Sequence, residues 1–329
     1  MKKVSIYRPN TVDEAIQILS QHGTDASVYA GGTDLLIRLK NRLEQAPSYL
    51  VDIKKIDHLR YIKEDAQGGV EIGAATKLTE LIDSRLLQEK YPMLVEAIGK
   101  ISSPELRNAS TLGGDLLQEV WCQYLRGGYP CWRNGGHICF GAIGDNSYYH
   151  SAMGGRLCYA VYPGDAATAL IPFDARAKLA TPQGVKELSI EQMVPGDMLV
   201  DGKIQSHVVR YNEILTSVVI PPPKPGLRAS FEKLRPRGVW DFAMASLGIS
   251  LQLRDKTIDD ARIVFGGIAG KPYREKAVET FLKGKTLNAE LGEQAISVAL
   301  AGAAPLKYNA TKIDMAKGLL ASGLARLNV

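Results

Sequence analysis

The chain has 329 residues, more than one hydrophobic core usually supports, so we expect two or three domains. Hydrophobic residues make up 45% and charged residues 23%, a balance that excludes a disordered chain. The sequence contains no run of about 18 apolar residues, so no membrane-spanning helix is predicted. The 40 basic and 35 acidic residues leave a net charge of +5 without a basic block, which argues against nucleic-acid binding.

The first 56 residues predict a small α/β unit. A capping-box pattern that begins at Thr11 opens an amphipathic helix. A short apolar strand over 27–30 then runs into the glycine turn 31–34, and a helical stretch follows this turn. A further apolar strand over 49–53 closes the unit, which we expect to form a first subdomain.

The next segment, residues 57–222, predicts a second subdomain with an irregular middle. It opens with a strand at 70–74 and ends with a strand at 217–220, and a second apolar-to-glycine turn covers 109–116. Eleven of the 32 glycines lie between residues 113 and 164. This part therefore predicts a long loop that is held by something other than strand pairing.

The run of prolines at 221–225 predicts an extended boundary before a third domain, residues 227–329, because proline cannot donate a strand hydrogen bond. The predicted elements of this domain are strands at 229–234, 243–253 and 261–265, followed by helices at 275–282, 290–301 and 310–327. Strands followed by helices are typical of an α+β domain.

The two glycine turns predict an anion site. A strand that ends in Gly31-Gly32-Thr33 before a helix presents backbone N–H groups, and Thr111 to Asp115 repeat this arrangement about 80 residues later. The first turn has neither the Rossmann nor the P-loop spacing, so an ordinary turn stays an alternative for it. Two such turns could grip a pyrophosphate from both sides, which makes a dinucleotide the natural ligand.

All four cysteines of the chain lie within 37 residues, which indicates a local site. Their spacing is C-x8-C-x7-C-x18-C, and the residues are Cys122, Cys131, Cys139 and Cys158. Zinc sites usually contain a close pair such as C-x2-C, and disulfides need an oxidising compartment. An iron–sulfur cluster tolerates wider spacing, because the loop folds around it. A cluster, a zinc ion, disulfides and structural thiols all stay open at this point.

The order of short motifs along the chain resembles one family, the FAD-binding (medium) subunits of the molybdenum hydroxylases, which include xanthine dehydrogenase, CO dehydrogenase and aldehyde oxidoreductases. The matching motifs are Ala30 to Leu35, Leu50 to Ile53, Gly73 to Thr76, Arg107 to Asp115, Tyr162 to Ala167, Phe231 to Lys233, Asp241 to Ala243 and Phe265 to Pro272. The resemblance covers the whole chain. It implies an α+β fold: a two-subdomain FAD-binding fold of the xanthine dehydrogenase and vanillyl-alcohol oxidase type, plus a C-terminal α+β domain of the CO dehydrogenase flavoprotein type.

The cysteine segment, about residues 117–160, resembles an insert found in one branch of this family. In that branch, which includes bacterial aldehyde oxidoreductases and 4-hydroxybenzoyl-CoA reductase, the flavin subunit holds an additional [4Fe–4S] cluster. The resemblance therefore implies that Cys122, Cys131, Cys139 and Cys158 are cluster ligands. The spacing is more similar to the aldehyde oxidoreductase insert than to the reductase insert.

The resemblance also assigns the flavin site. The residues that would wrap the FAD pyrophosphate are Val28, Tyr29, Ala30, Gly31, Gly32, Thr33, Asp34 and Leu35 on one side, and Thr111, Gly113, Gly114 and Asp115 on the other. Asp165 matches an aspartate that hydrogen-bonds the cofactor, Leu215 a residue that packs on the isoalloxazine, and Lys233 a lysine near the ring. The chain departs from the family pattern at Asp34 and Tyr162, where other residues are common.

Plainer interpretations of some residues stay open. Asp165 could only cap the helix that follows it, and Lys233 could be a surface lysine in a strand. His150, although it lies in the insert, is expected to be a packed or hydrogen-bonded histidine and not a ligand.

The function that the resemblance implies is electron transfer by one subunit of a heterotrimer, which can pair into a dimer of heterotrimers. A large subunit would carry the molybdopterin site and a small subunit [2Fe–2S] clusters, and no side chain of this chain would be catalytic. The complex would oxidise aldehydes or aromatic heterocycles. A reductase that sends electrons toward an aroyl-CoA, a stand-alone FAD oxidase and a zinc-bound scaffold are the alternatives. Because no apolar segment precedes Pro9, we expect no secretory signal and a cytoplasmic location, or a periplasmic one through a partner's Tat leader.

Overall fold

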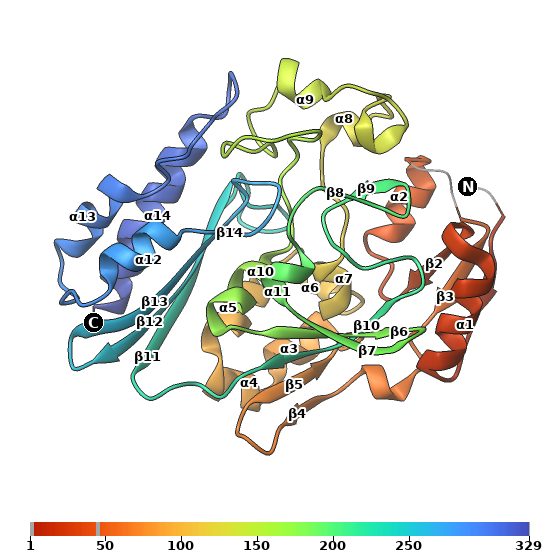
Figure 1. The fold of residues 1–329 in the computed structure, drawn as a ribbon, viewed down its shortest axis with the longest axis horizontal. Helices are drawn as coiled ribbons and strands as arrows, with labels where there is room; N and C mark the ends of the chain where they lie inside the picture. Colours follow the sequence, from red (N-terminus) through yellow and green to blue (C-terminus); the bar gives the residue numbers. More distant parts are fainter. Residues whose placement is uncertain (1–2, 44–46, 329) are drawn as a thin grey trace.

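The structure is a computed structural model that describes residues 3–43 and 47–328, so the expected domain limits at residues 1 and 329 lie outside the described residues. Figure 1 shows the first subdomain at one end of the molecule, the C-terminal domain at the other, and the second subdomain between them. The cysteine insert covers one edge of this arrangement.

The first subdomain is a parallel three-stranded sheet with one long helix packed on it. The strand order is β1-β3-β2, formed by β1 (Ser5–Tyr7), β3 (Tyr49–Asp52) and β2 (Ala26–Tyr29), and the helices are α1 (Val12–His22) and α2 (Leu35–Asn41). Thr11 caps α1 by accepting the N–H of Glu14, as the capping-box pattern predicts. Parallel pairing of β2 and β3 fixes where β2 ends, and so fixes the start of the first glycine turn.

The second subdomain is an antiparallel five-stranded sheet in the order β4-β5-β10-β6-β7, with helices on one side. The strands are β4 (Ile62–Glu64), β5 (Val70–Gly73), β10 (Ile214–Ile220), β6 (Arg176–Thr181) and β7 (Gly184–Ser189), with a separate hairpin of β8 (Met198–Val200) and β9 (Lys203–Gln205). The helices are α3 (Leu78–Asp83), α4 (Arg85–Lys90), α5 (Pro92–Gly99), α6 (Pro104–Arg107), α7 (Leu112–Leu116), α10 (Asp165–Leu170) and α11 (Ile190–Met193). The last strand, β10, pairs with β5 near the start of the subdomain, so the chain returns across the sheet after the insert.

The α-helices of the insert are short, α8 (Gln123–Arg126) and α9 (Phe140–Ile143). Residues 117–160, all of which the structure describes, form no β-strand, and isolated bridges join His150 to Ala160 and Met153 to Ala304. This confirms the prediction of an irregular loop. Four turns of 3-10 helix complete the helical elements described, at Gly23–Asp25, Asp57–Leu59, Trp132–Asn134 and Ile171–Phe173.

The C-terminal domain is a four-stranded antiparallel sheet with three helices, as the α+β prediction requires. Its elements are β11 (Leu227–Leu234), β12 (Ala245–Arg254), β13 (Thr257–Gly266), β14 (Tyr273–Arg274), α12 (Lys276–Leu282), α13 (Leu291–Val298) and α14 (Thr311–Leu327). The helix expected over 290–301 ends earlier, at Val298, because Ala299 is extended and Leu300 has a positive φ of 58°.

Helix α10 joins the second subdomain to the C-terminal domain. All six of its residues are buried, and Gly248 of β12 lies so close that a Cβ on it would be 2.4 Å from the carbonyl oxygen of Thr168. The main core correspondingly continues from the second subdomain to Phe231 and Val264 of the C-terminal sheet. This packing holds Asp165, the first residue of α10, against the C-terminal sheet. No helix in the described ranges has the length and apolar character that a membrane crossing requires.

Candidate functional site

The first glycine turn lies between β2 and α2 and touches the second glycine turn directly. A Cβ on Gly31 would be 2.2 Å from the carbonyl oxygen of Ala109, so only glycine fits there. Gly32 adopts a positive φ of 74°, which favours glycine for a second reason. The hydroxyls of Thr33 and Ser110 lie 3.0 Å apart. The two turns that the sequence singled out are therefore neighbours in space.

The second glycine turn uses its own amides to hold itself in place. The Gly113 N–H donates to the carbonyl oxygen of Ala74 at 2.8 Å, and the Gly114 N–H donates to Thr111 Oγ1 at 3.1 Å, which caps α7. Gly113 also lets the turn approach β5, since a Cβ there would be 3.0 Å from the same carbonyl oxygen. These two amides already have protein partners, so the contact of this turn with FAD stays a prediction.

Three buried charged residues meet beside the second turn. Lys233, from β11, places its ammonium 2.6 Å from Asp165 Oδ2, and the two side chains are only 1% and 6% exposed. Asp115 Oδ2 accepts the N–H of Ala166 at 3.0 Å, and Asp115 Oδ1 accepts from Gln118 at 2.8 Å. Burial, with a smaller contribution from the charge of Asp165, raises the pKa of Asp115 to about 7.

This cluster decides two alternatives that the sequence left open. Lys233 is not a surface lysine, because its side chain is enclosed and also donates to the carbonyl oxygen of Lys100. Asp165 makes no helix-capping hydrogen bond, since Gly164 is the N-cap of α10, and its partner is Lys233. Tyr162, which had no assigned role, donates to the carbonyl oxygen of Leu116 at 2.9 Å and so fixes the end of α7.

Two of the residues assigned to the flavin site, Asp34 and Leu215, contact other parts of the protein in the structure. Asp34 pairs with Arg38 at 3.0 Å and with Arg126 of the insert at 3.1 Å. It also accepts the N–H of Glu119 at 3.1 Å, so its carboxylate joins the first turn to the insert. Leu215 is buried, 4% exposed, in the core of the second subdomain. The contacts of both residues with FAD stay predictions.

The four cysteines line one small cavity. They come from four separate stretches of the insert, yet all four border a cavity of about 10 Å³ with mainly apolar walls. The other lining residues are Tyr124, Leu125, Trp132, Arg133, Ile138, Phe140, Gly141 and Leu157. All four are free thiols, which argues against the disulfide alternative. Within the described ranges, no group of three or more His, Cys, Asp or Glu side chains is placed to hold a single metal ion. The thiols thus surround a space and do not converge on one point.

The electrostatics of this cavity differ between the thiols. A hydrogen bond from Cys158 lowers the pKa of Cys139 to about 6, whereas burial raises the pKa of Cys122. The Nε2 atom of His150 lies 3.4 Å from Cys122 Sγ. Burial and the nearby Lys312 lower the pKa of His150 to about 4, so the ring is neutral and packed, as expected.

Sequence reasoning missed the side chains that hold the insert in place. Lys312, at the start of α14, is fully buried and donates to the carbonyl oxygens of Tyr148 and His150 at 2.5 and 3.1 Å. Asn309 donates to the carbonyl oxygens of His150 and Ser151. Within the insert, Arg133 is a buried partner of Cys158. No local pattern marks any of these residues.

Comparison with known families shows where this arrangement occurs. Residues 2–223 match the family described as the FAD binding domain in molybdopterin dehydrogenase, and residues 229–324 match the CO dehydrogenase flavoprotein C-terminal domain. The chain belongs to the FAD-binding subunits of the molybdenum hydroxylases. This confirms the resemblance to this family, and with it the assignment of the chain as an oxidoreductase subunit that binds FAD; membership of the branch with a cluster insert stays a prediction.

Individual relatives support the family along the whole chain. The aldehyde oxidoreductase FAD-binding subunit PaoB of Escherichia coli K12 is 31% identical over 99% of this chain and 98% of its own length. The carbon monoxide dehydrogenase medium chain of Hydrogenophaga pseudoflava is 29% identical over 90% of this chain and 85% of its own length. A solved structure of carbon monoxide dehydrogenase from the same organism superposes with a TM-score of 0.78 at 25% identity, covering 99% of this chain and 97% of that one. The predicted fold class is therefore confirmed.

Proposed function

We propose that this chain is the electron-transfer subunit of a molybdenum hydroxylase complex and that it holds both FAD and a [4Fe–4S] cluster. Its partners would be a large molybdenum-cofactor subunit and a small [2Fe–2S] subunit. The chain would relay electrons between these partners and an external acceptor. When bound, FAD exchanges one or two electrons and a [4Fe–4S] cluster exchanges one, which lets this subunit join one-electron and two-electron partners.

The observation that carries the cluster proposal is the cavity lined by all four cysteines. Cubane clusters take four cysteine thiolates at their corners, and all four cysteines of the chain line this one cavity. A single zinc ion needs ligands that converge on one point, which the described residues do not offer. Trp132 and Phe140 in the cavity wall would keep water from the sulfurs.

For FAD, the fit rests on the two glycine turns and the charged residues beside them. Gly31 and Gly113 give the close backbone approach that a pyrophosphate needs, and the turns meet edge to edge. The ammonium of Lys233 is held by Asp165, which fixes its position and keeps it from solvent. We propose that Lys233 and Asp165 orient the cofactor and hold charge next to it, and that Asp115 keeps the second turn attached to α10.

The relatives support aldehyde oxidation by the complex, because PaoB is described as a subunit of an aldehyde oxidoreductase and matches this chain end to end. Other relatives are named for carbon monoxide, xanthine and nicotinate, which shows that this type of subunit serves several substrates. We propose an aldehyde or an aromatic heterocycle as the substrate of the complex. Reduction of the FAD in the assembled complex by an aldehyde, with no reoxidation of reduced FAD by an aroyl-CoA, would support this choice.

The experiment that tests the cluster is the exchange Cys131→Ser in the full chain, purified without oxygen. We expect iron to fall from about four atoms per chain to less than one, because one corner ligand is lost, while FAD is retained. Ser147→Ala, in the same insert, is the matched control and should keep its iron. Unchanged iron in the Cys131→Ser chain would contradict the ligand assignment.

A further inference from the structure

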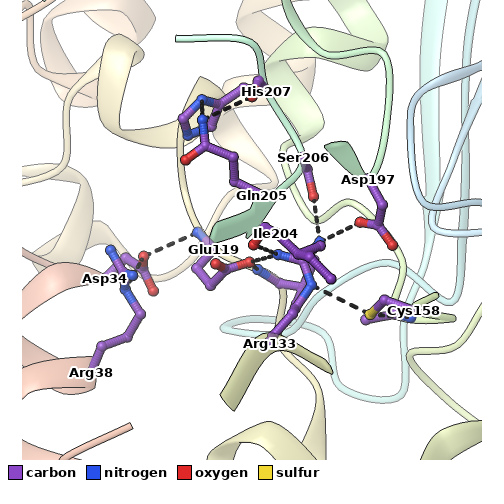
Figure 2. A network of polar contacts seen from close by, with 12 residues as sticks. Asp34, Arg38, Glu119, Arg133, Cys158, Asp197, Ile204, Gln205, Ser206 and His207 are labelled. Carbon is purple, nitrogen blue, oxygen red and sulfur yellow. Dashed lines mark hydrogen bonds and ion pairs between the residues drawn. The ribbon is translucent and has the colours of Figure 1, made fainter. Parts of the chain in front are cut away.

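Arg133 lies at the centre of a buried polar network that begins at a cysteine sulfur (Figure 2). Its side chain is 2% exposed, and its Nε donates to Cys158 Sγ at 3.3 Å. One terminal nitrogen donates to Glu119 Oε1 at 2.5 Å and to the carbonyl oxygen of Ile204 at 3.2 Å. The other donates to Ser206 at 3.1 Å and to Asp197. The guanidinium therefore ties the insert to the β8–β9 hairpin as well as to Glu119.

The same network continues from Glu119 to the first glycine turn. The backbone N–H of Glu119 donates to Asp34 Oδ2 at 3.1 Å, and Asp34 in turn pairs with Arg38 of α2 at 3.0 Å. Figure 2 shows this continuous line, with Asp34 and Arg38 at one end and Cys158 at the other. Only Glu119 and Arg133 lie between the sulfur and the carboxylate of the glycine turn.

The fixed geometry and the burial of this network make it a rigid connection between the insert and the first glycine turn, and not a loose surface contact. A guanidinium donates in a fixed planar fork, so its partners hold one relative geometry. Glu119 and Asp197 are each 14% exposed, which leaves little water to replace a lost partner. Glu119 Oε1 also accepts the N–H of Val120 at 2.7 Å. The carboxylate of Glu119 is therefore held against the backbone next to the Glu119 N–H that donates to Asp34. Movement of Cys158 would thus displace the group that holds Asp34.

We propose that Arg133 couples the cysteine cavity to the first glycine turn, so that cluster binding and FAD binding strengthen each other. Arg133 is a positioning residue in this scheme: it touches the sulfur of Cys158 but acts on FAD only through Glu119 and Asp34. The inference rests on the proposed function, since it requires that both groups bind. Coupling of this kind is reciprocal, so each group must raise the affinity for the other by the same factor.

The test measures the dissociation constant of FAD by flavin fluorescence on the full chain, once with the cluster and once after anaerobic removal of iron by a chelator. For the unaltered chain we expect FAD to bind at least about fivefold more tightly when the cluster is present, the lower end of common coupling factors. The single ammonium of Arg133→Lys cannot reach the same acceptors. In this variant the ratio of the FAD dissociation constant without the cluster to that with the cluster should therefore fall to about two or less. In addition, saturating FAD should slow iron loss to the chelator in the unaltered chain and not in Arg133→Lys.

Arg210→Lys is the matched control, because Arg210 makes an exposed two-point contact with Asp201 at the other end of the same hairpin. Its ratio should equal that of the unaltered chain. If Arg133→Lys does not fold, Glu119→Gln decides, since it keeps the shape of the side chain but weakens the contact with Arg133, and its ratio should also fall. If the unaltered chain binds both iron and FAD but the ratio of its two FAD dissociation constants is near one, the coupling is overturned and the proposed function stands. A chain that takes up no iron would instead overturn the proposed function, and an equal loss of coupling in Arg210→Lys would overturn the role of Arg133.

Discussion

The flavin side of the molecule and the cysteine insert are built in different ways. The two glycine turns are positioned by backbone contacts, with Gly31 against Ala109 and Gly113 against Ala74. The insert has no strand and is held by long side chains, chiefly Arg133 and Lys312, that reach distant carbonyl oxygens and carboxylates. The flavin side should therefore be sensitive to added bulk, and the insert to lost charge and hydrogen bonds.

The largest effect should come from Lys233 and Asp165, a buried long-range ion pair on the flavin side. Lys233→Met leaves Asp165 buried without its partner, and we expect the free energy of unfolding to fall by about 3–5 kcal/mol. Denaturant unfolding measures this change. Lys63→Met is the control, because its pair with Glu71 is solvent-exposed on the lysine side and should contribute about 1 kcal/mol or less. Equal losses in the two variants would contradict the buried-pair account.

Gly31→Ala tests the steric fit of the glycine turns. The added Cβ would meet the backbone carbonyl of Ala109, which cannot move without shifting the second turn, so we expect a loss toward about 3 kcal/mol and weaker FAD binding. Gly99→Ala, at the end of α5 with open space around the new Cβ, should leave both quantities unchanged or slightly improved. Thermal unfolding and flavin fluorescence measure the two effects, and normal FAD binding by Gly31→Ala would refute the close contact.

Lys312 gives the insert a pH dependence of its stability. Burial lowers the pKa of Lys312 to about 7, so between pH 7 and 9 the unfolded chain holds a proton that the folded chain has lost. Unfolding free energy should therefore rise with pH, by about 2 kcal/mol across this window. Lys312→Met should remove this part of the rise, and the difference between the two chains isolates it from other groups. Identical pH profiles would show that Lys312 keeps an ordinary pKa.

The smallest effect is expected for the hydrogen bond between the glycine turns. Ser110→Ala removes the contact with Thr33 Oγ1 but keeps the backbone fit, so it should cost about 1 kcal/mol of stability and little FAD affinity. Denaturant unfolding and FAD titration measure both. A loss of FAD affinity as large as that of Gly31→Ala would show that the hydroxyl pair, and not the steric fit, holds the turns together.

The same contrast explains what the sequence could predict. The glycine turns, the proline boundary and helix α14 follow from local patterns, since their causes lie within a few neighbouring residues. The partners of Arg133 lie as far as 73 residues away in the chain, and those of Lys312 more than 160, so no spacing rule marks them. Lys312 in particular has the sequence context of a solvent-facing lysine near a helix start. Asp34 shows another limit of local patterns. Its motif assigns it to FAD but gives no sign that its carboxylate also contacts Glu119 and Arg126 of the insert.

The central claim, that one chain holds FAD and a four-iron cluster, is tested most directly by the iron and flavin content of the chain purified without oxygen. The account predicts a flavin spectrum with about one FAD and about four irons per chain, and a paramagnetic signal of the reduced cluster. Flavin without iron, in a chain whose four cysteines remain free thiols, would contradict it.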